Sequence, residues 1–395
     1  FGAREDISVH IHVAMLALVT GRPVKMVYDR NESFVGHVKR HPSRLWLRHE
    51  ADHDGTLVKV TAKLILDGGA YAHTSRAVLA NSAFFTVGPY RCDNVFVDAA
   101  AVRTNNPPAG AMRGFGAVQT CFAYEMQMDR LARALSMDPL DLRRRNALGP
   151  GDPMATSGQI IEGSLPTVGV IDAVAAIPLP PPIEGDDPRS LPGGTGLTTP
   201  PSRVVRGIGY AVGLKNLAFS EAFDDFAEAR VVMTPAGVEV HTAAIEVGQG
   251  LITVCQQIAR TVLNADRVAV VWADTSQIGS AGSTSASRQT QMTGGAVHAA
   301  SVGLRDAILE RHGGDDLRSD GVYRSGERVA TIDEICTGGP VEHHVQFRHP
   351  PTERPDENGQ GDVHAGFVVA AHRAVVDVDP DLGLVRVVRV DTAQD

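Results

Sequence analysis

Three loops rich in glycine and small polar residues carry the residue types that binding chemistry needs. They read "NNPPAGAMRGFGA", "AAIEVGQGL" and "ADTSQIGSAGSTSASRQT", and each follows a predicted strand and precedes a predicted helix. The first N–H groups of a helix lack partners within that helix, so such junctions suit an anionic or strongly polar ligand. Three of them in one chain indicate a phosphate-bearing cofactor that is gripped from several sides.

The loops do not match the common phosphate-binding motifs. "GQG" is not followed by Gly-Lys-Ser/Thr, and no G-x-G-x-x-G opens a strand–helix–strand unit. Taken singly, each loop is more often a turn than a binding site, because such junctions are common. A loop arginine such as Arg113 is likewise more often solvated or paired with an acid.

No metal-binding or disulfide pattern is legible in the sequence. His10 and His12 lie two apart on a predicted helix and therefore on diverging faces. The histidines of "EHHVQFRH" have no carboxylate at a suitable spacing, and the four cysteines form no C-x-x-C pair. We therefore predict no metal ligands in this chain and a reducing, cytoplasmic location.

Length and charge limit the class of partner. The 395 residues suffice for two or three domains, and the net charge of -9 comes without any long basic run. This argues against nucleic acid or an anionic membrane surface as the main partner. No apolar run approaches the ~18 residues that span a bilayer. Small molecules or protein subunits are the expected partners.

The elements that must position the loops mix helices and strands. "REDISVHIHVAMLALVTGRP" predicts a helix with one buried face, and "PVKMVYD" predicts a strand. Asp54-Gly55 is a strong turn signal between two long strands within 43–71. Further strands are predicted at 94–104, 207–217, 226–233, 237–245, 268–272 and, as a hairpin, 363–390, and further helices at 117–135, 137–149, 251–263 and 289–311.

Residues 177–203 are so rich in proline and glycine that they predict a linker. We therefore divide the chain into a first domain at 1–176, the linker at 177–203 and a second domain at 204–395. The predicted fold class is α+β, with mixed sheets and helices in both domains.

Seven short motifs occur in order along the chain. They read "FGARED", "TGRPVKMVYDRNESF", "RHP", "AMRGFGAVQ", "DPLDLRRRNAL", "EVGQG" and "GSTSASRQTQMTGGAV". In this combination the sequence resembles the molybdenum-binding subunit of the xanthine dehydrogenase and aldehyde oxidase family of molybdenum hydroxylases. The resemblance extends over nearly the whole chain, apart from the linker and the loop "HPPTERPDENGQGD". It implies that both domains bind molybdopterin.

The resemblance also implies an enzymatic activity. A family member holds molybdenum–molybdopterin, or a dinucleotide form of it, and hydroxylates a carbon of a purine-like or other N-heteroaromatic ring, or an aldehyde. Oxygen comes from water, and electrons leave through iron–sulfur and FAD centres on partner subunits or domains. We find no ligands for those centres in this sequence and therefore expect a heteromeric assembly.

Roles in substrate binding are carried over from the family one residue at a time. Glu5 matches a glutamate that faces the substrate, while Arg113 and Phe115 match the arginine and phenylalanine of the pocket. Tyr210 lies where a second aromatic ring stacks on the substrate. Asn81 replaces an arginine that orients purines, so an anionic or carbonyl group loses its cationic partner there and xanthine is not favoured.

Roles in cofactor binding fall on the three loops. Gln249 matches a glutamine that hydrogen-bonds the cofactor beside the metal, and the flanking glycines permit close approach. The loop "GSTSASRQT" supplies hydroxyl, backbone and charged donors for the phosphate or nucleotide tail. The residues predicted to bind the cofactor are Gly114, Gly248, Gln249, Gly250, Ser283, Ser285, Ser287, Arg288 and Gln289.

No catalytic residue is assigned within the chain. The family's base is a glutamate in a glycine-rich segment that we expect downstream of Asp395. "FGARED" likewise begins partway through a longer motif. We therefore expect an internal fragment of a larger subunit, truncated at both ends and inactive in isolation. The alternative is a non-catalytic module that binds cofactor or partner without turnover.

Overall fold

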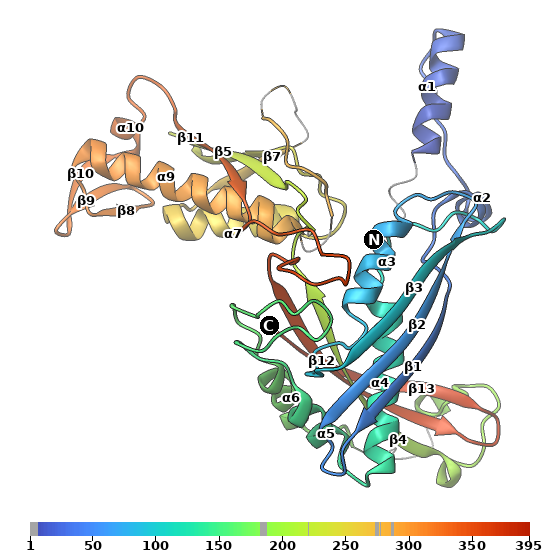
Figure 1. Ribbon diagram of the computed structural model, residues 1–395. Coiled ribbons are helices and arrows are strands. Elements are labelled where there is room, and N and C mark those ends of the chain that lie inside the picture. The colour runs from blue at the N-terminus through green and yellow to red at the C-terminus, as the bar shows by residue number, and fades with distance from the viewer. Residues whose placement is uncertain (1–6, 182–187, 220, 273–275, 277, 286–287) are drawn as a thin grey trace. The chain divides into compact units, whose positions relative to one another are not determined.

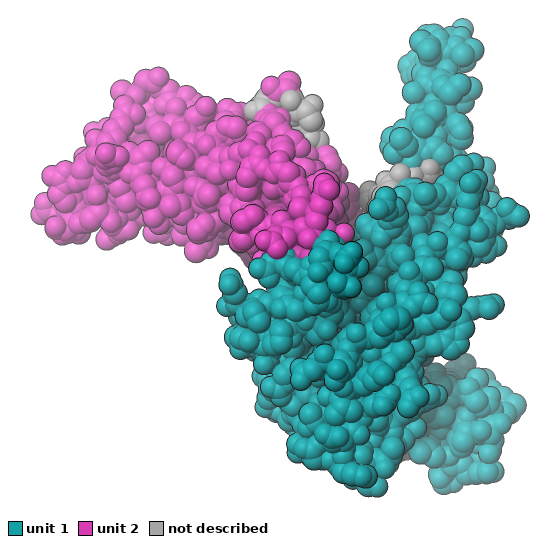
Figure 2. Space-filling view, in the orientation of Figure 1, with its two compact units in different colours: residues 1–215, 355–362, 367–395 teal, residues 216–354, 363–366 magenta. Residues whose placement is uncertain are grey.

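The computed structural model describes residues 7–181, 188–219, 221–272, 276, 278–285 and 288–395. It has the predicted α+β character, with helices and strands mixed along the chain (Figure 1). The chain divides into two compact units, which Figure 2 shows in two colours. Unit 1 comprises residues 1–215, 355–362 and 367–395, and unit 2 comprises residues 216–354 and 363–366.

A hairpin begins the first sheet of unit 1. β1 (Ser43–Ala51) and β2 (Leu57–Gly69) pair antiparallel, and the chain reverses at Asp54-Gly55, as the sequence predicted. Gly55 has a φ of 91°, a left-handed conformation that glycine adopts without steric cost. Side chains alternate along β2 between the buried face and the other face, so Val60, Ala62, Leu64 and Leu66 all turn toward the core.

β3 (Val95–Arg103) joins β2 in parallel and completes the order β1-β2-β3. A parallel connection needs a crossover, and α3 (Ser75–Phe84) lies within it. α4 (Ala117–Ala134) packs against β1, and the core beside it contains the buried side chains of Tyr124 and Met128. The crossover thus places α3 close to the start of α4.

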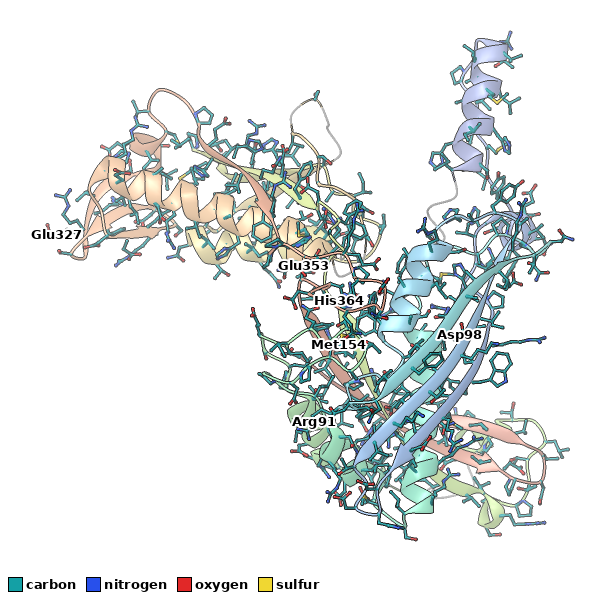
Figure 3. All side chains as sticks on the ribbon, in the orientation of Figure 1. Arg91, Asp98, Met154, Glu327, Glu353 and His364 are labelled. Carbon is teal, nitrogen blue, oxygen red and sulfur yellow. The ribbon has the colours of Figure 1, made fainter. Side chains whose placement is uncertain are left out.

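The other face of this sheet is exposed. Trp46, Lys63 and Asp98 are register neighbours across the three strands, and 52% of Trp46 is accessible. Lys63 Nζ lies 3.9 Å from the carboxylate of Asp98, which is labelled on β3 in Figure 3. An exposed ion pair of this kind contributes little to stability. Lys63 is therefore a neutral position for control substitutions.

α5 (Pro139–Asn146) begins as the sequence predicted. The side chain of Asp138 accepts hydrogen bonds from the backbone N–H groups of Leu140 and Asp141, and Pro139 occupies the first helical position. Arg143 of this helix is fully buried and donates to Glu125 of α4. The pair ties the two helices together.

A second sheet in unit 1 has the order β13-β12-β4. β12 (Phe367–Asp379) and β13 (Leu384–Gln394) form the predicted terminal hairpin, and β4 (Val205–Asn216) lies beside β12. α6 (Thr167–Ala176) packs against β12 and β13. The described part of the predicted linker contains two single turns, η1 (Pro188–Ser190) and η2 (Pro201–Arg203).

The sequence division at residues 177–203 stays a prediction. The boundaries of the two compact units differ from this division, because the final hairpin, β12 and β13, belongs to unit 1 together with residues 1–215.

Unit 2 contains a four-stranded sheet of order β11-β5-β6-β7. Its strands are β5 (Phe226–Thr234), β6 (Gly237–Thr242), β7 (Val268–Trp272) and β11 (Val341–Arg348). Two helices pack together beside it, α7 (Leu251–Leu263) and α9 (Gly294–His312), which follows the π-helical turn η3 (Gln289–Thr293). The residues of α7 that are buried recur every four positions, which is why this helix shows one apolar stripe to the core.

β6 and β7 run parallel, and α7 crosses between them. Their last residues, Thr242 and Trp272, are register partners, so both strands end at the same edge of the sheet. This edge, at the ends of two neighbouring parallel strands, is the usual place for a ligand in a parallel sheet.

A small sheet of order β10-β9-β8 completes unit 2. It consists of β8 (Asp316–Arg318), β9 (Gly321–Arg324) and β10 (Glu327–Thr331), followed by α10 (Ile332–Ile335). These strands were not predicted from the sequence, because segments of three to five residues show too little alternation.

The structure corrects two predictions near the N-terminus. α1 (Ser8–Thr20) is helical as predicted, but its predicted buried face is wrong, because no residue of α1 is buried. The apolar spacing predicted the helix correctly, but it gives no information on whether another element covers the apolar face. Residues 23–29, "PVKMVYD", do not form a strand and lead instead into α2 (Arg30–Gly36), which Asp29 caps. None of the described helices is long and apolar enough to cross a membrane.

Candidate functional site

The predicted site residues fall into two groups, one in each unit. Unit 1 contains the substrate-binding candidates Asn81, Arg113, Phe115 and Tyr210, together with Gly114. Unit 2 contains the remaining cofactor-binding candidates that the structure describes: Gly248, Gln249, Gly250, Ser283, Ser285, Arg288 and Gln289. Glu5 and Ser287 lie outside the described residues. Each group is described within its own unit.

The unit 1 loop at residues 111–116 is a tight left-handed turn. Gly114, Phe115 and Gly116 have φ values of 89°, 46° and 94° in succession. A Cβ on Gly116 would lie 2.3 Å from the carbonyl oxygen of Val78 and 2.6 Å from Oγ of Ser82, both on α3. Only glycine fits there, so the loop is seated directly on α3. Phe115 takes a conformation that non-glycine residues seldom adopt, which the packing must hold in place.

Arg113 is exposed at the apex of this turn, and Phe115 beside it is half-buried. The carbonyl oxygen of Arg113 accepts a hydrogen bond from Nη2 of Arg40 at 2.6 Å. The backbone of the turn is thus fixed from the motif "RHP", while the two side chains remain at the surface of unit 1. This placement suits the pocket wall predicted from the sequence, although their contact with substrate stays a prediction.

Incompletely satisfied polar atoms adjoin the loop. Among the described residues, Arg40 Nη1, His41 Nδ1 and Gln119 Oε1 are buried and have no hydrogen-bond partner. Gln119 Nε2 donates to the carbonyl oxygen of His41, so these residues are neighbours. A buried polar atom without a partner costs roughly 1–3 kcal/mol, which a polar ligand or a water molecule would recover. This side of unit 1 therefore fits a polar group bound close to the loop.

Asn81 lies on α3 with 5% of its surface exposed. Its Oδ1 accepts a hydrogen bond at 2.6 Å from Nζ of Lys215, near the end of β4. The same ammonium lies 5.2 Å from the ring centroid of Phe85, and burial lowers the pKa of Lys215 to about 7. Lys215 is not among the residues predicted from the sequence, although it is the only charged residue in "GIGYAVGLKN".

Tyr210 is half-buried on the same strand, β4. Its carbonyl oxygen accepts from Nη2 of the buried Arg143 at 3.2 Å, and the hydroxyl of Tyr124 donates to the carbonyl oxygen of Val212 at 3.0 Å. Side chains from α4 and α5 therefore fix the backbone of β4 directly ahead of Lys215. The stacking role of the Tyr210 ring stays a prediction.

In unit 2, the loop at residues 245–250 is closed by its own side chains. The carboxylate of Glu246 accepts hydrogen bonds from the backbone N–H groups of Gly248, Gly250 and Ile252, at 2.7, 3.2 and 3.1 Å. These bonds hold the pKa of Glu246 below its ordinary value. Gln249 accepts from Val247 N and donates to the carbonyl oxygen of Ile245, so its amide is engaged at both ends.

The two glycines of "GQG" are needed for their backbone conformation. Gly248 and Gly250 have φ values of 94° and 84°, and a Cβ on either would meet nothing within 4 Å. One side of the loop is therefore open, so a ligand can approach its backbone. The amide of Ile245 donates to Oγ1 of Thr284, which joins this loop to the one that follows β7.

The second unit 2 loop is anchored by Arg288. This side chain is 2% exposed and forms a close ion pair with Asp225, whose carboxylate accepts from both Nε and Nη2. Its remaining N–H groups donate to the carbonyl oxygens of Ala281, Ser283 and Phe226. Gln289 Nε2 also donates to the carbonyl oxygen of Ser283. The N–H donors of Arg288 thus bind the loop and Asp225. A contact between Arg288 and the cofactor stays a prediction.

The donor set of this edge suits a polar organic group. It presents the Gln249 amide, open glycine backbone and the serine and threonine side chains at 283–285. Within the described part of the chain, no group of three or more His, Cys, Asp or Glu side chains is placed to hold a metal ion. The donors present at this edge fit the organic part of a cofactor, held by hydrogen bonds.

Comparison with known proteins gives both halves of the chain the same description. Residues 1–147 and residues 197–395 match two family models, each described as a molybdopterin cofactor-binding domain.

Similar proteins match large parts of the chain. A "probable xanthine dehydrogenase" subunit of Bacillus subtilis is 30% identical over 97% of this chain and 50% of its own length. The nicotinate dehydrogenase large molybdopterin subunit of Eubacterium barkeri is 44% identical over 44% of this chain and 40% of its own length. The structure of the aldehyde oxidoreductase from Desulfovibrio gigas superposes with a TM-score of 0.81 at 26% identity, over 100% of this chain and 41% of that one. The chain thus spans half or less of the length of these relatives.

Proposed function

The chain belongs to the family of molybdenum hydroxylases that includes xanthine dehydrogenase and aldehyde oxidoreductase, and on that premise we propose that it forms the cofactor-binding part of a complete hydroxylase. Its two molybdopterin cofactor-binding domains account for most of the chain. The observation that carries the proposal is the structural match over the entire chain to an aldehyde oxidoreductase at 26% identity.

We propose that the edge of the unit 2 sheet holds the cofactor. Gln249 and the backbone of Gly248 and Gly250 bind near the metal, and the 283–289 loop binds the tail through Ser283, Ser285, Ser287, Arg288 and Gln289. The open side of the "GQG" loop and the hydroxyl-rich neighbouring loop support this assignment. When bound, the molybdenum cofactor supplies hydroxylation with oxygen from water and passes the electrons onward.

We propose a planar N-heteroaromatic substrate, with purine-like rings and aldehydes in the same range. Phe115 contacts the ring face, Arg113 supplies donors and charge, and Glu5 and Tyr210 complete the pocket. The relative with the highest identity quoted above is named for nicotinate, a pyridine ring that bears a carboxylate. Asn81 in place of a purine-orienting arginine makes xanthine itself a poor candidate.

The complete enzyme needs parts that this sequence does not contain. We propose that iron–sulfur and FAD subunits or domains accept the electrons in a heteromeric, cytoplasmic assembly. A glutamate outside this sequence is the proposed base, taking a proton as the substrate carbon is attacked. The residues described here would then bind, orient and shield the substrate, while proton transfer depends on that glutamate.

Metal and pterin analysis of the complete subunit tests this proposal. Purified subunit should contain close to one molybdenum and one pterin per chain. Gln249→Ala should lower both, because it removes an amide that we place beside the metal. Gln346→Ala, at an exposed position on β11, should retain both. A complete subunit without molybdenum and pterin, expressed where related enzymes are loaded, would overturn the proposal.

A further inference from the structure

Lys215, near the end of β4, places its amine against α3, the helix on which the loop with Arg113 and Phe115 is seated. Lys215 Nζ donates to Asn81 Oδ1 at 2.6 Å and lies 5.2 Å from the ring of Phe85. Asn81 and Phe85 are four residues apart, so they occupy the same face at the end of α3. This face of α3 therefore holds the ammonium by an amide oxygen on one turn and a ring on the next.

The loop with Arg113 and Phe115 is seated on the same side of α3. Gly116 closes onto the carbonyl oxygen of Val78 and the hydroxyl of Ser82. Positions 78, 81, 82 and 85 are related as i, i+3, i+4 and i+7, which is one continuous stripe of a helix. Lys215 and the 113–116 loop thus meet α3 along one stripe, within unit 1.

We propose that Lys215 is a specificity-determining residue, whose ammonium donates a hydrogen bond to an anionic substituent, such as a carboxylate, on a planar N-heteroaromatic substrate. This inference rests on the proposed function, because Arg113 and Phe115 are pocket residues only if the chain serves a hydroxylase. It narrows the proposed substrates from planar N-heteroaromatic rings in general to such rings that bear an acidic group, for example a carboxylate.

The surroundings of Lys215 suit this role. Asn81 Oδ1 and the face of the Phe85 ring are neutral, so these two contacts orient the ammonium and neither of them cancels its charge. Because burial lowers the pKa of Lys215 to about 7, the charged form is poorly solvated in its site. A carboxylate brought beside it would stabilise that form and gain a charge-assisted hydrogen bond.

The same geometry changes the role of Asn81. Sequence comparison placed Asn81 where a purine-orienting arginine would stand and predicted that a cation was lost. The structure brings a different cation to within 2.6 Å of that side chain, from a strand 134 residues further along the chain. Asn81 is then a positioning residue that holds Lys215, and the charge reaches the pocket from β4 instead of α3.

The experiment compares two ligands of nearly equal size in the complete subunit with its cofactor and partner subunits. Pyridine-3-carboxylate carries the charge, and pyridine-3-carboxamide does not. Binding of both is measured by isothermal titration calorimetry at pH 6.5, and turnover of both is measured in parallel. Wild-type protein should bind the acid at least about tenfold more tightly than the amide, as a charge-assisted hydrogen bond provides.

Four variants isolate the charge. Lys215→Met should abolish the preference for the acid and leave binding of the amide within about twofold, while Lys215→Arg should retain most of the preference. Lys63→Met, on the exposed face of the first sheet, should behave as wild type. If Lys215→Met does not fold, as judged by circular dichroism, Asn81→Ala replaces it, and this variant should reduce the preference at least about threefold, because the amine loses its holder.

The outcomes separate the two proposals. A wild-type protein with no preference for the acid, or a folded Lys215→Met protein that keeps the full preference, overturns the role of Lys215. A wild-type subunit that lacks molybdenum and turns over neither compound contradicts the proposed function instead. Binding is measured in either case, so the two failures are distinguishable.

Discussion

The loops at residues 111–116 in unit 1 and 245–250 in unit 2 both end in Gly-x-Gly and are held in different ways. Each ends at a glycine N-cap with positive φ, Gly116 at 94° before α4 and Gly250 at 84° before α7. A Cβ on Gly116 would collide with α3, whereas a Cβ on Gly250 would meet nothing within 4 Å. Packing therefore fixes the first loop, and backbone N–H groups that donate to the side chains of Glu246 and Gln249 fix the second.

The difference corresponds to what each loop must present. A loop that offers side chains, such as Arg113 and Phe115, is best supported from behind by a rigid element. A loop that lets a cofactor approach its backbone must stay open, so its shape has to come from bonds within the loop and to its neighbours. Substitutions in the two loops should therefore differ both in their cost to stability and in their effect on cofactor binding.

The largest expected loss follows from removing Arg288, which anchors the second unit 2 loop. Arg288→Met should lower the free energy of unfolding by about 4 kcal/mol, because Asp225 becomes a buried charge without its partner. Urea denaturation followed by circular dichroism measures the loss, and hydrogen exchange locates it. Protection should fall first in peptides that cover 281–293.

Arg305→Met is the matched control on α9 of the same unit. The Arg305 side chain is 37% exposed and pairs with its neighbour Asp306, so its removal should change stability by less than about 0.5 kcal/mol. Equal losses at the two arginines would show that the ion pair with Asp225 does not hold the loop.

Gly116→Ala has the next largest expected loss in the free energy of unfolding, and it tests packing in unit 1. The new methyl group would lie 2.3 Å from a backbone oxygen of α3, in addition to the strain of a positive φ. Together these effects should cost about 3 kcal/mol. The loss is measured by urea denaturation in a Trp272→Phe background, so that the fluorescence of Trp46 on β1 reports unit 1 alone.

Gly151→Ala separates the collision from the strain. Gly151 also has a positive φ, 86°, but a Cβ there would meet nothing within 4 Å. This variant should lose only about 1 kcal/mol. If Gly116→Ala costs no more than Gly151→Ala, the first loop is not held by packing against α3.

Local signals in the sequence predicted much of this scaffold. Asp138 and Pro139 marked the start of α5, and Asp54-Gly55 marked the hairpin of β1 and β2, because both signals act within a few residues. The capping box of α2, with Asp29 and Glu32, was equally local and was missed. Long-range features were not predicted. Whether α1 has a buried face, for example, depends on neighbouring elements that helical spacing cannot specify.

The candidate site was predictable in its loops and less so in its partners. The sequence pointed to Asn81 and Arg288 as residues facing a ligand. In the structure, Asn81 holds Lys215 and Arg288 holds Asp225. Both contacts join residues far apart in the chain, over 134 and 63 positions, so no local pattern reveals them. A motif identifies a loop, but only the fold shows which donors the protein itself uses.

Glu246→Ala tests whether hydrogen bonds shape the unit 2 loop. Three backbone N–H groups lose their shared acceptor and turn to water, which should cost about 1–2 kcal/mol, as the loss of a helix cap does. Hydrogen exchange at pH 7 should show faster exchange in peptides covering 245–252 and no change in those covering 111–117. A loop that stays fully protected in this variant would contradict the assignment.

Acid should reproduce this effect in the wild-type protein. The N–H groups of Ile252, Gly250 and Gly248 hold the pKa of Glu246 below its ordinary value. The carboxylate therefore stabilises the folded loop above the ordinary pKa, and the gain is lost as pH falls through the lowered value. Protection factors of wild type and Glu246→Ala at 245–252 should converge toward low pH, and a constant difference would exclude the carboxylate as the cause.

Among the substitutions within the two loops, Gly250→Ala has the smallest expected effect on stability, and it sharpens the comparison most. Strain at a φ of 84° is its only cost in the folded chain, so it should lose about 1 kcal/mol, as Gly151→Ala does and unlike Gly116→Ala. The added methyl group nevertheless projects from the loop into open space, where we propose that the cofactor approaches. Molybdenum and pterin content of the complete subunit should therefore fall well below that of Gly151→Ala, although both variants are equally stable. Full cofactor content in Gly250→Ala would mean that the open side of this loop is not where the cofactor binds, even if packing still distinguishes the two loops.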